Sequence, residues 1–291
     1  MEQLCPDKTY IINAFTGRGL RGNPAAVCVL DEWPPDPEMQ RLAAEYNLSE
    51  TAFVVEEKSS AGTVPANASG AAAGPDVATG NVSRYHIRWF TPTCEVSLCG
   101  HATLSAAYVL TEYYGACEII EFSSGGGPLT VRKIPADKGF LLEMDFPVKK
   151  ISRAVIDAET ERLLGIRPAE IFLTCDLVCV LEDAAQVENF RPDFEKIKRI
   201  PGVEGVIITA VCEDGEFDFV SRCFYPGEGI DEDPVTGSSM CSLMPYWSGR
   251  CKKEWLYARQ ASERGGALRC RLTGDQVIIR GEAELDRVIC R

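Results

Sequence analysis

The sequence predicts an α+β protein built from two similar lobes related by a pseudo-twofold axis, and three observations support this fold class. The chain has 291 residues, and at about 150 residues per domain that length accommodates two domains. The pattern R-x-F-x-P occurs at residues 88–92 and again at 222–226. Each copy is followed by an acidic loop, a glycine turn and a run of small residues, at nearly the same offset. This repetition indicates two homologous halves.

The first half begins with a predicted hairpin. Residues 9–15 are β-rich, and the apolar run at 23–30 has the length and valine content of a second strand. Residues 17–22 between them match G-x-G-x-x-G, a pattern that binds dinucleotides only when a helix follows. Because a strand follows instead, we interpret the glycines as a hairpin-like loop and reject nucleotide binding.

Other elements follow from residue spacing and capping. A helix is predicted from Asp36, as its cap, to Tyr46, and Asn47 is expected to end it in a left-handed conformation. A second helix is predicted at 102–110, where small and apolar residues on all sides indicate burial on every face. Strands or apolar runs are predicted at 48–55, 85–90, 129–134, 139–145, 171–181, 204–211, 217–224 and 277–283, and a further helix at 157–164.

Amino-acid composition indicates an insertion within the first lobe and a boundary between the two lobes. Residues 58–83 are rich in Ala, Gly, Ser, Pro and Asn, which predicts a mobile surface insertion. The glycine-rich stretch at 123–128 predicts a boundary between an N-terminal lobe, 1–127, and a C-terminal lobe, 128–276.

Charge and cysteine content exclude several classes of function. The chain carries 43 acidic and 30 basic residues, a formal charge of −13, so nucleic acid is not an expected partner. No apolar run approaches the ~20 residues of a membrane span, so no membrane partner is expected. There are 13 Cys and 2 His, without the paired spacing of a disulfide scaffold or zinc site, so we expect no metal and a reducing, cytoplasmic location.

The two glycine turns, at Gly100 and Gly237, predict a binding cleft. Each turn precedes a helix, whose free N–H groups and dipole favour an anion. Two such turns facing one another would hold a small carboxylate-bearing metabolite. The alternative is that the glycines only let helices pack closely. The density of polar residues at both turns, including His101, Asp233 and Ser238, favours function.

Glu50, at the start of an apolar strand, is a candidate acid or base. A buried carboxyl must be paired, solvated or raised in pKa, and a pKa near neutrality suits removal of a proton from carbon. An exposed strand-end glutamate is equally consistent with the spacing. His101 and Asp233 could also have purely structural roles. His101 could be a helix-start histidine that forms local hydrogen bonds, and Asp233 could be a turn residue. Cys99 is a cleft-lining thiol that could also be catalytic.

These residues carry a resemblance that runs in order from about residue 10 to 285. The matching segments are Asn13-Ala14-Phe15, Gly22-Asn23-Pro24-Ala25-Ala26-Val27, Leu48-Ser49-Glu50-Thr51, Cys99-Gly100-His101-Ala102-Thr103, Glu232-Asp233-Pro234-Val235-Thr236-Gly237-Ser238 and Arg264-Gly265-Gly266. In this combination the chain resembles the PhzF, or phenazine-biosynthesis-like, family.

The resemblance implies a fold similar to diaminopimelate epimerase, with two lobes of mixed sheet each curved around a central helix. It implies that the last strand, within 277–291, returns to the first lobe. It also implies a homodimer and a cofactor-free isomerase, the best-known member acting on a dihydro-hydroxyanthranilate. By position in the motifs, Glu50 would move the proton beside His101 and Asp233, and Gly100, Gly237 and Ser238 would hold the substrate carboxylate.

One departure from the family pattern leaves alternatives open. Family members often read G-S-A-H, whereas this chain reads Gly237-Ser238-Ser239-Met240. An epimerase or racemase using Cys99 is one alternative, although the second half has no cysteine before its glycine turn to supply a facing thiol. A metabolite-binding or regulatory protein that kept the fold without turnover is another.

Overall fold

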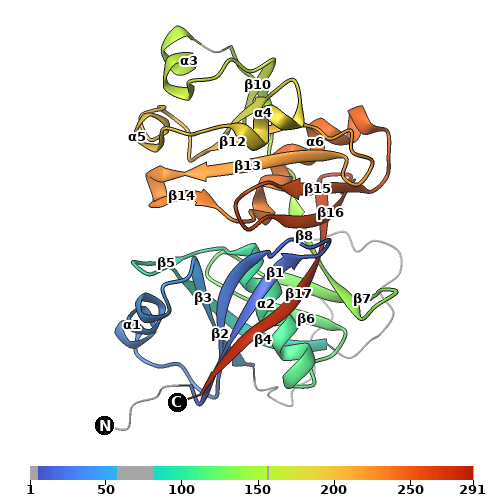
Figure 1. Cartoon of the computed structure of the whole chain (residues 1–291). Helices are drawn as coiled ribbons and strands as arrows, with labels where there is room; N and C mark the ends of the chain where they lie inside the picture. Colours follow the sequence, from blue (N-terminus) through green and yellow to red (C-terminus); the bar gives the residue numbers. More distant parts are fainter. Residues whose placement is uncertain (1–5, 58–81, 156, 291) are drawn as a thin grey trace.

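The computed structural model describes residues 6–57, 82–155 and 157–290, which form two lobes lying one above the other in Figure 1. The lower, first lobe is a barrel of eight strands. Their bounds are β1 Lys8–Thr16, β2 Asn23–Leu30, β3 Glu50–Glu56, β4 Val82–Phe90, β6 Ile119–Ser123, β7 Leu129–Pro135, β8 Phe140–Pro147 and β17 Gln276–Cys290.

These strands pair in a closed ring in the order β1–β2–β3–β4–β6–β7–β8–β17, and β17 pairs back to β1. Helix α2 (Gly100–Tyr113) fills the barrel and contacts β1, β2, β3, β8 and β17. Every residue from 102 to 110 except Tyr108 is buried. This confirms the prediction of a helix that is buried on nearly every face.

The second lobe repeats much of this arrangement around helix α6 (Met240–Cys251), which contacts β16 and β17. Its strands pair in the order β9–β10–β11–β12–β13–β15–β16–β17. Their bounds are β9 Ser152–Arg153, β10 Glu170–Leu173, β11 Leu177–Val180, β12 Val206–Val211, β13 Phe219–Tyr225, β15 Leu256–Gln260 and β16 Gly266–Thr273. The pairs β11–β12 and β13–β15 are parallel, as β2–β3 and β4–β6 are in the first lobe.

A second hydrophobic cluster lies on the outer face of this sheet. Residues of β11, β12 and β13 pack there beneath three short helices, at the top of Figure 1. The helices are α3 Ala158–Leu164, α4 Ala184–Asn189 and α5 Phe194–Ile197. The sheet of the second lobe is therefore apolar on both faces. In the first lobe, a smaller outer cluster packs beneath helix α1 (Asp36–Tyr46) in the same way.

The repeated R-x-F-x-P motif places an arginine that braces a hairpin in each lobe. Arg88 on β4 forms two hydrogen bonds with Glu95 of β5 (Glu95–Val96), at 2.8 and 2.7 Å. Arg222 on β13 does the same with Glu232 of β14 (Ile230–Asp233), at 2.7 and 2.8 Å. The motif therefore has a structural role: its arginine holds the hairpin together and so positions the loop that follows.

The structure corrects several sequence-based boundaries. Strands β7 and β8 belong to the first lobe, so the chain leaves that lobe after Pro147 and not at residue 127. Strand β17 is longer than predicted and joins both lobes: its first residues pair with β16 and its later ones with β1 (Figure 1). The run at 171–181 is broken by a turn at 174–176 into β10 and β11.

Near the N-terminus, most of the local predictions agree with the structure. Strands β1 and β2 form an antiparallel hairpin, and Gly22 in its loop has φ +68°, with Ala14 O 2.3 Å from where a Cβ would lie. Helix α1 (Asp36–Tyr46) ends at Asn47 with φ 49°, as predicted, although its N-cap is Pro35 rather than Asp36. The insertion predicted at 58–83 lies outside the described residues, except for its last two, which begin β4.

The structure also shows the state of the cysteines and the lengths of the apolar helices. In the described segments, no disulfide joins any two cysteines. No helix among the residues that the structure describes is long and apolar enough to cross a membrane.

Candidate active site

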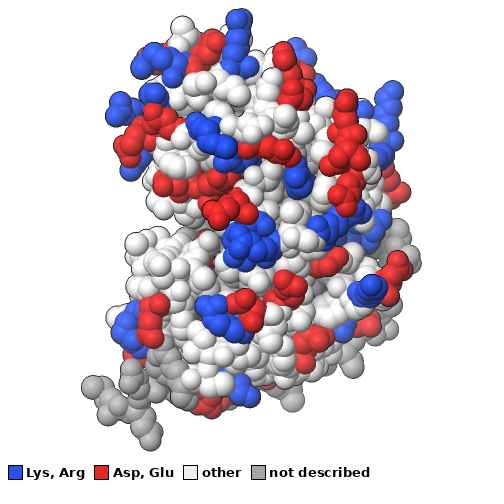
Figure 2. Space-filling model, in the orientation of Figure 1, with Lys and Arg blue, Asp and Glu red and all other residues white. Residues whose placement is uncertain are grey.

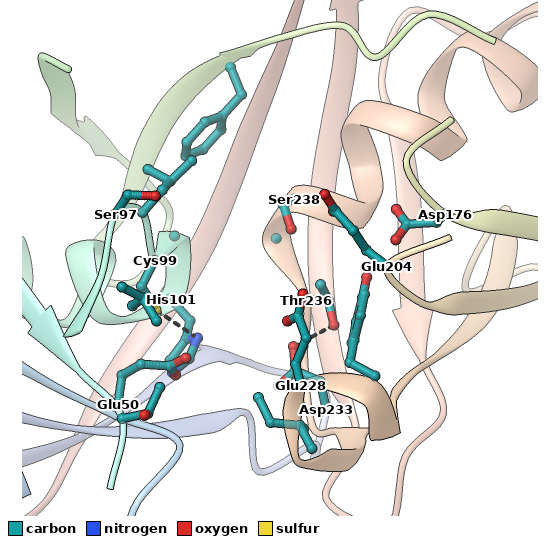
Figure 3. A pocket seen from close by; sticks show the side chains of 18 of the residues that line it. Glu50, Ser97, Cys99, His101, Asp176, Glu204, Glu228, Asp233, Thr236 and Ser238 are labelled. Carbon is teal, nitrogen blue, oxygen red and sulfur yellow. Dashed lines mark hydrogen bonds and ion pairs between the residues drawn. The ribbon is translucent and has the colours of Figure 1, made fainter. Parts of the chain in front are cut away.

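A cavity of about 810 Å³ lies between the two lobes, and all seven predicted site residues line it. The first lobe contributes Glu50, Cys99, Gly100 and His101, and the second contributes Asp233, Gly237 and Ser238. Figure 3 shows the two groups facing one another across the opening. The structure thus brings together side chains that are up to 188 positions apart in the chain (50 to 238).

Glu50 is the first residue of β3, and only 9% of it is exposed. Strand β3 pairs with β2 and β4 in the closed barrel, and Glu50 lies opposite Ala25 of β2. Burial and the nearby carboxylate of Asp233 raise the pKa of Glu50 to about 8. At neutral pH this carboxyl therefore exists in both protonation states, which suits a group that gives and takes protons.

His101, in the first turn of α2, lies beside Glu50. Its Nε2 is 3.2 Å from Oε2 of Glu50, without the angle of a hydrogen bond. Its Nδ1 is 3.3 Å from Nδ2 of Asn23 and 3.5 Å from Sγ of Cys99. Because an amide nitrogen only donates, a proton on Nδ1 would face another donor, so we place the ring proton on Nε2, facing Glu50. Burial lowers the pKa of His101 to about 3, so the ring is neutral.

Asp233 ends β14 and is held by a network from both lobes. Nδ2 of Asn23 donates to its Oδ1 at 2.8 Å, and the hydroxyl of Thr236 donates to its Oδ2. Gln260 donates to its backbone carbonyl at 2.8 Å. Burial raises the pKa of Asp233, and the hydrogen bonds from Thr236 and Asn23 oppose that rise. The carboxylate is therefore fixed in orientation opposite Glu50.

Both glycine turns present helix starts to the cavity. Helix α2 begins at Gly100, and the short helix η2 (Gly237–Ser239) leads into α6; none of these starts has a side-chain cap. A Cβ on Gly100 would meet only Phe146, at 3.7 Å, so packing does not demand glycine there. A Cβ on Gly237 would lie 3.4 Å from the Phe15 ring, so close packing contributes at that turn.

Cys99 lines the cavity, but its thiol is not in a reactive state. It is 7% exposed, and burial, followed by the charge of Glu50, raises its pKa well above the ordinary value. A protonated thiol is a poor nucleophile and a poor base. Among the described residues that line the cavity from the second lobe there is no cysteine to face it.

The cluster of Glu50, Cys99 and His101 also has the ligand types of a metal site, with their atoms within 4.8 Å of one another. However, Cys99 faces Nδ1 of the ring and Glu50 faces Nε2. A metal on either nitrogen would therefore have one of the other two ligands on the wrong side, and the arrangement fits proton transfer better than metal binding.

Sequence reasoning missed several residues of the site. Asn23 was visible in the G-N-P segment, but nothing nearby in sequence indicated its partners. The second lobe adds an acidic wall of Asp176, Glu204 and Glu228 with Lys149 among them. Met240, which stands where many family members have histidine, is fully buried and does not line the cavity.

Known proteins are similar to this chain in sequence and in fold. An uncharacterized isomerase from Pseudomonas aeruginosa is 44% identical over 276 residues, covering 94% of each chain. A crystal structure of a PhzF-family phenazine biosynthesis protein from Enterococcus faecalis superposes with a TM-score of 0.83 at 40% identity, covering 97% of each chain. A hydroxyproline epimerase from Agrobacterium vitis shares the fold alone, with a TM-score of 0.56 and 10% identity, over 97% of this chain and 91% of that one.

The fold and site together define an enzyme of the isomerase class on an epimerase- and racemase-type fold. The family model described as phenazine biosynthesis-like protein matches residues 12–286, and the chain belongs to that family.

Proposed function

We propose that this protein is a cofactor-independent isomerase that moves a proton between carbons of a small substrate carrying one carboxylate. The observation that carries the proposal is Glu50: a buried carboxyl, open to the cavity, with its pKa raised to about 8 and a neutral imidazole 3.2 Å away. As a carboxylate, Glu50 takes the proton from an activated carbon. As the acid, it returns that proton to another carbon of the same bound molecule.

In this mechanism the neighbouring groups position the substrate and Glu50. His101 offers its Nε2–H toward Glu50 and favours the charged form when the proton leaves the substrate. Asp233, fixed by Asn23 and Thr236, accepts a hydrogen bond from a polar group of the substrate. The uncapped starts of α2 and of η2, with Ser238, bind the substrate carboxylate through N–H groups.

The charge of the cavity supports a substrate with a single carboxylate. Glu50, Glu95, Asp176, Glu204, Glu228 and Asp233 line it, with Lys149 as the one lysine or arginine among the described lining residues. A second carboxylate placed away from the helix starts would face several like charges.

A deuterium-uptake experiment tests the proposal. A panel of cyclic and aromatic carboxylates is incubated with the enzyme in heavy water and followed by NMR. We expect the wild type to introduce deuterium into at least one compound and Glu50→Gln to abolish that uptake. Glu56→Gln, which changes an exposed glutamate of the same strand that does not line the cavity, is the matched control and keeps it. Uptake that survives in Glu50→Gln contradicts the assignment.

The same experiment separates the alternatives. Inversion at one stereocentre that Cys99→Ser abolishes would indicate an epimerase using that thiol. Saturable binding of a carboxylate without uptake or conversion would indicate a metabolite-binding protein on the same fold.

We also propose that the two lobes arose by duplication and are related by a pseudo-twofold axis. The equivalent parallel strand pairs and the equivalent Arg88–Glu95 and Arg222–Glu232 bridges support this. That no disulfide joins the described cysteines supports a reducing, cytoplasmic location. A homodimer stays a prediction of the family resemblance.

A further inference from the structure

The outer face of β15–β17 carries a cluster of arginines around one indole ring. The guanidinium carbons of Arg269, Arg271 and Arg280 lie 4.9, 4.8 and 4.1 Å from the centre of the Trp255 ring. On the face shown in Figure 2, Lys and Arg side chains gather near the junction of the two lobes. In a chain of net charge −13 such a concentration of positive charge is a local exception.

The register of β16 and β17 places arginines opposite one another, which is unfavourable unless their charges are neutralised. Arg269 of β16 lies directly opposite Arg280 of β17, and like charges at opposed positions destabilise a sheet. Arg280 is neutralised by Glu143, at 2.6 Å, and Arg271 by Glu254, at 2.8 Å.

Arg269 has no such partner. It forms no ion pair with any residue that the structure describes, whereas Arg271 and Arg280 each do; the buried Nε atoms of Arg269 and Arg271 both lack a hydrogen-bond partner, so the missing ion pair is what distinguishes Arg269. The guanidinium stacks against Tyr257, 5.5 Å from the ring centre, as well as Trp255, so its orientation is set by two aromatic rings. An oriented guanidinium with unused donors is a site for a planar or tetrahedral oxyanion.

This guanidinium opens onto a second cavity, of about 590 Å³, between the lobes. Four cationic side chains line it against two acidic ones: Arg18, Lys138, Arg269 and Arg280 against Asp137 and Glu282. Arg18 is engaged with Glu216 at 3.0 Å, and Arg280 with Glu143. No residue lines both this cavity and the acidic cavity that contains Glu50.

We propose that this second cavity is a binding site for the oxyanion group of a small metabolite, a phosphate or a carboxylate, with Arg269 as its principal contact. Lys138, in the turn between β7 and β8, adds a second positive charge from the other lobe. The proposal is independent of the isomerase proposal, because it uses different residues in a different cavity.

Calorimetric titration tests the site, with inorganic phosphate in one arm and acetate in the other, at constant ionic strength set by sodium chloride. We expect saturable binding of at least one anion by the wild type, and the two arms show which oxyanion the site prefers. Arg269→Gln should weaken that binding by about tenfold or more, since one bidentate charge-assisted contact is lost.

Arg271→Gln is the matched control. It removes a guanidinium from the same strand and the same indole ring, but Arg271 does not line the cavity and already has Glu254. We expect its binding constant to stay within about twofold of the wild type. Lys138→Gln, an exposed turn substitution that leaves the sheet intact, should weaken binding about threefold and serves if Arg269→Gln does not fold. Absence of saturable binding in both arms, or equal weakening by Arg269→Gln and Arg271→Gln, overturns the proposal.

Discussion

Asn23 and Asp233 join the two lobes at the active site: the amide nitrogen of Asn23 donates to Oδ1 of Asp233 over 2.8 Å. Asn23 is fully buried on β2 of the barrel, and Asp233 ends β14 of the second lobe. The same nitrogen lies 3.3 Å from Nδ1 of His101 and 3.0 Å from the carbonyl oxygen of Val235. One amide group therefore contacts the second lobe and also constrains the tautomer of the imidazole beside Glu50.

Replacing Asn23 with Ala should reduce kcat by about ten- to a hundredfold and lower the free energy of unfolding by about 1–3 kcal/mol. The buried acceptors on Asp233 and Val235 would lose their donor, and the His101 tautomer would lose its constraint. Turnover measured with unfolding in urea checks both effects. Asn23→Asp is the informative control: its carboxyl can donate only when protonated, so its kcat relative to that of the wild type at the same pH should partly recover at low pH. Loss of stability with unchanged kcat would show a purely structural role.

The free energy of unfolding should depend on pH through Glu50 and His101 in opposite directions. The pKa of Glu50 in the folded protein, about 8, lies above its ordinary 4.5, so stability falls as pH rises from 4.5 to 8. The pKa of His101, about 3, lies below its ordinary 6.5, so stability rises with pH from 3 to 6.5. Each slope is at most about 1.4 kcal/mol per pH unit. The two cancel between about 4.5 and 6.5.

Urea unfolding from pH 3 to 9 measures these slopes. Glu50→Gln should remove the decline between pH 6.5 and 8, and His101→Gln should remove the loss below pH 4.5. A Glu50→Gln protein that keeps the wild-type decline would show that another group has the raised pKa.

Cys99 should be dispensable for proton transfer. Its raised pKa keeps the thiol protonated, so Cys99→Ser is expected to retain more than about a tenth of wild-type turnover. Iodoacetamide at pH 7.5 should modify the exposed Cys94 and Cys290 before Cys99, as mass spectrometry of peptides would show. Turnover that falls in Cys99→Ser as far as in Glu50→Gln would instead favour the thiol mechanism.

The two repeated arginines should differ in their contribution to stability. Arg222 is 7% exposed and also donates to the carbonyls of Val187 and Phe190, at 3.2 and 2.7 Å. Arg88 has a more exposed side chain and bonds Asp36 besides Glu95. Arg222→Lys should cost about 2–4 kcal/mol, because a lysine cannot satisfy the carboxylate and both carbonyls, and Arg88→Lys about 1 kcal/mol or less. Equal losses in urea unfolding would contradict this ranking.

Several predictions that depended on short-range patterns agree with the structure, although the N-cap of α1 is Pro35 and not Asp36. Asn47 ends α1 in the left-handed region because its own side chain tolerates that conformation, and the buried helix α2 follows from its uniformly small and apolar residues. The lobe boundary was wrong because glycines at 123–128 mark a turn between paired strands β6 and β7, which composition cannot distinguish from a linker. Strands β14, β15 and β16 escaped prediction because β14 is acidic and β15 and β16 mix charged and apolar residues.

The candidate groups could be identified from the amino-acid sequence: the glutamate in L-S-E-T, the histidine after the first glycine turn, and the aspartate before the second glycine turn. Their motif positions and many local turns and periodicities are properties of neighbouring residues, so they can be read along the chain. What those groups can do depends on the folded structure. The pKa of Glu50 depends on burial inside a closed barrel and on the charge of Asp233, and the ring proton of His101 depends on Asn23. Burial and through-space charge act over a few ångströms between residues that are tens to hundreds of positions apart, and no local pattern records those distances.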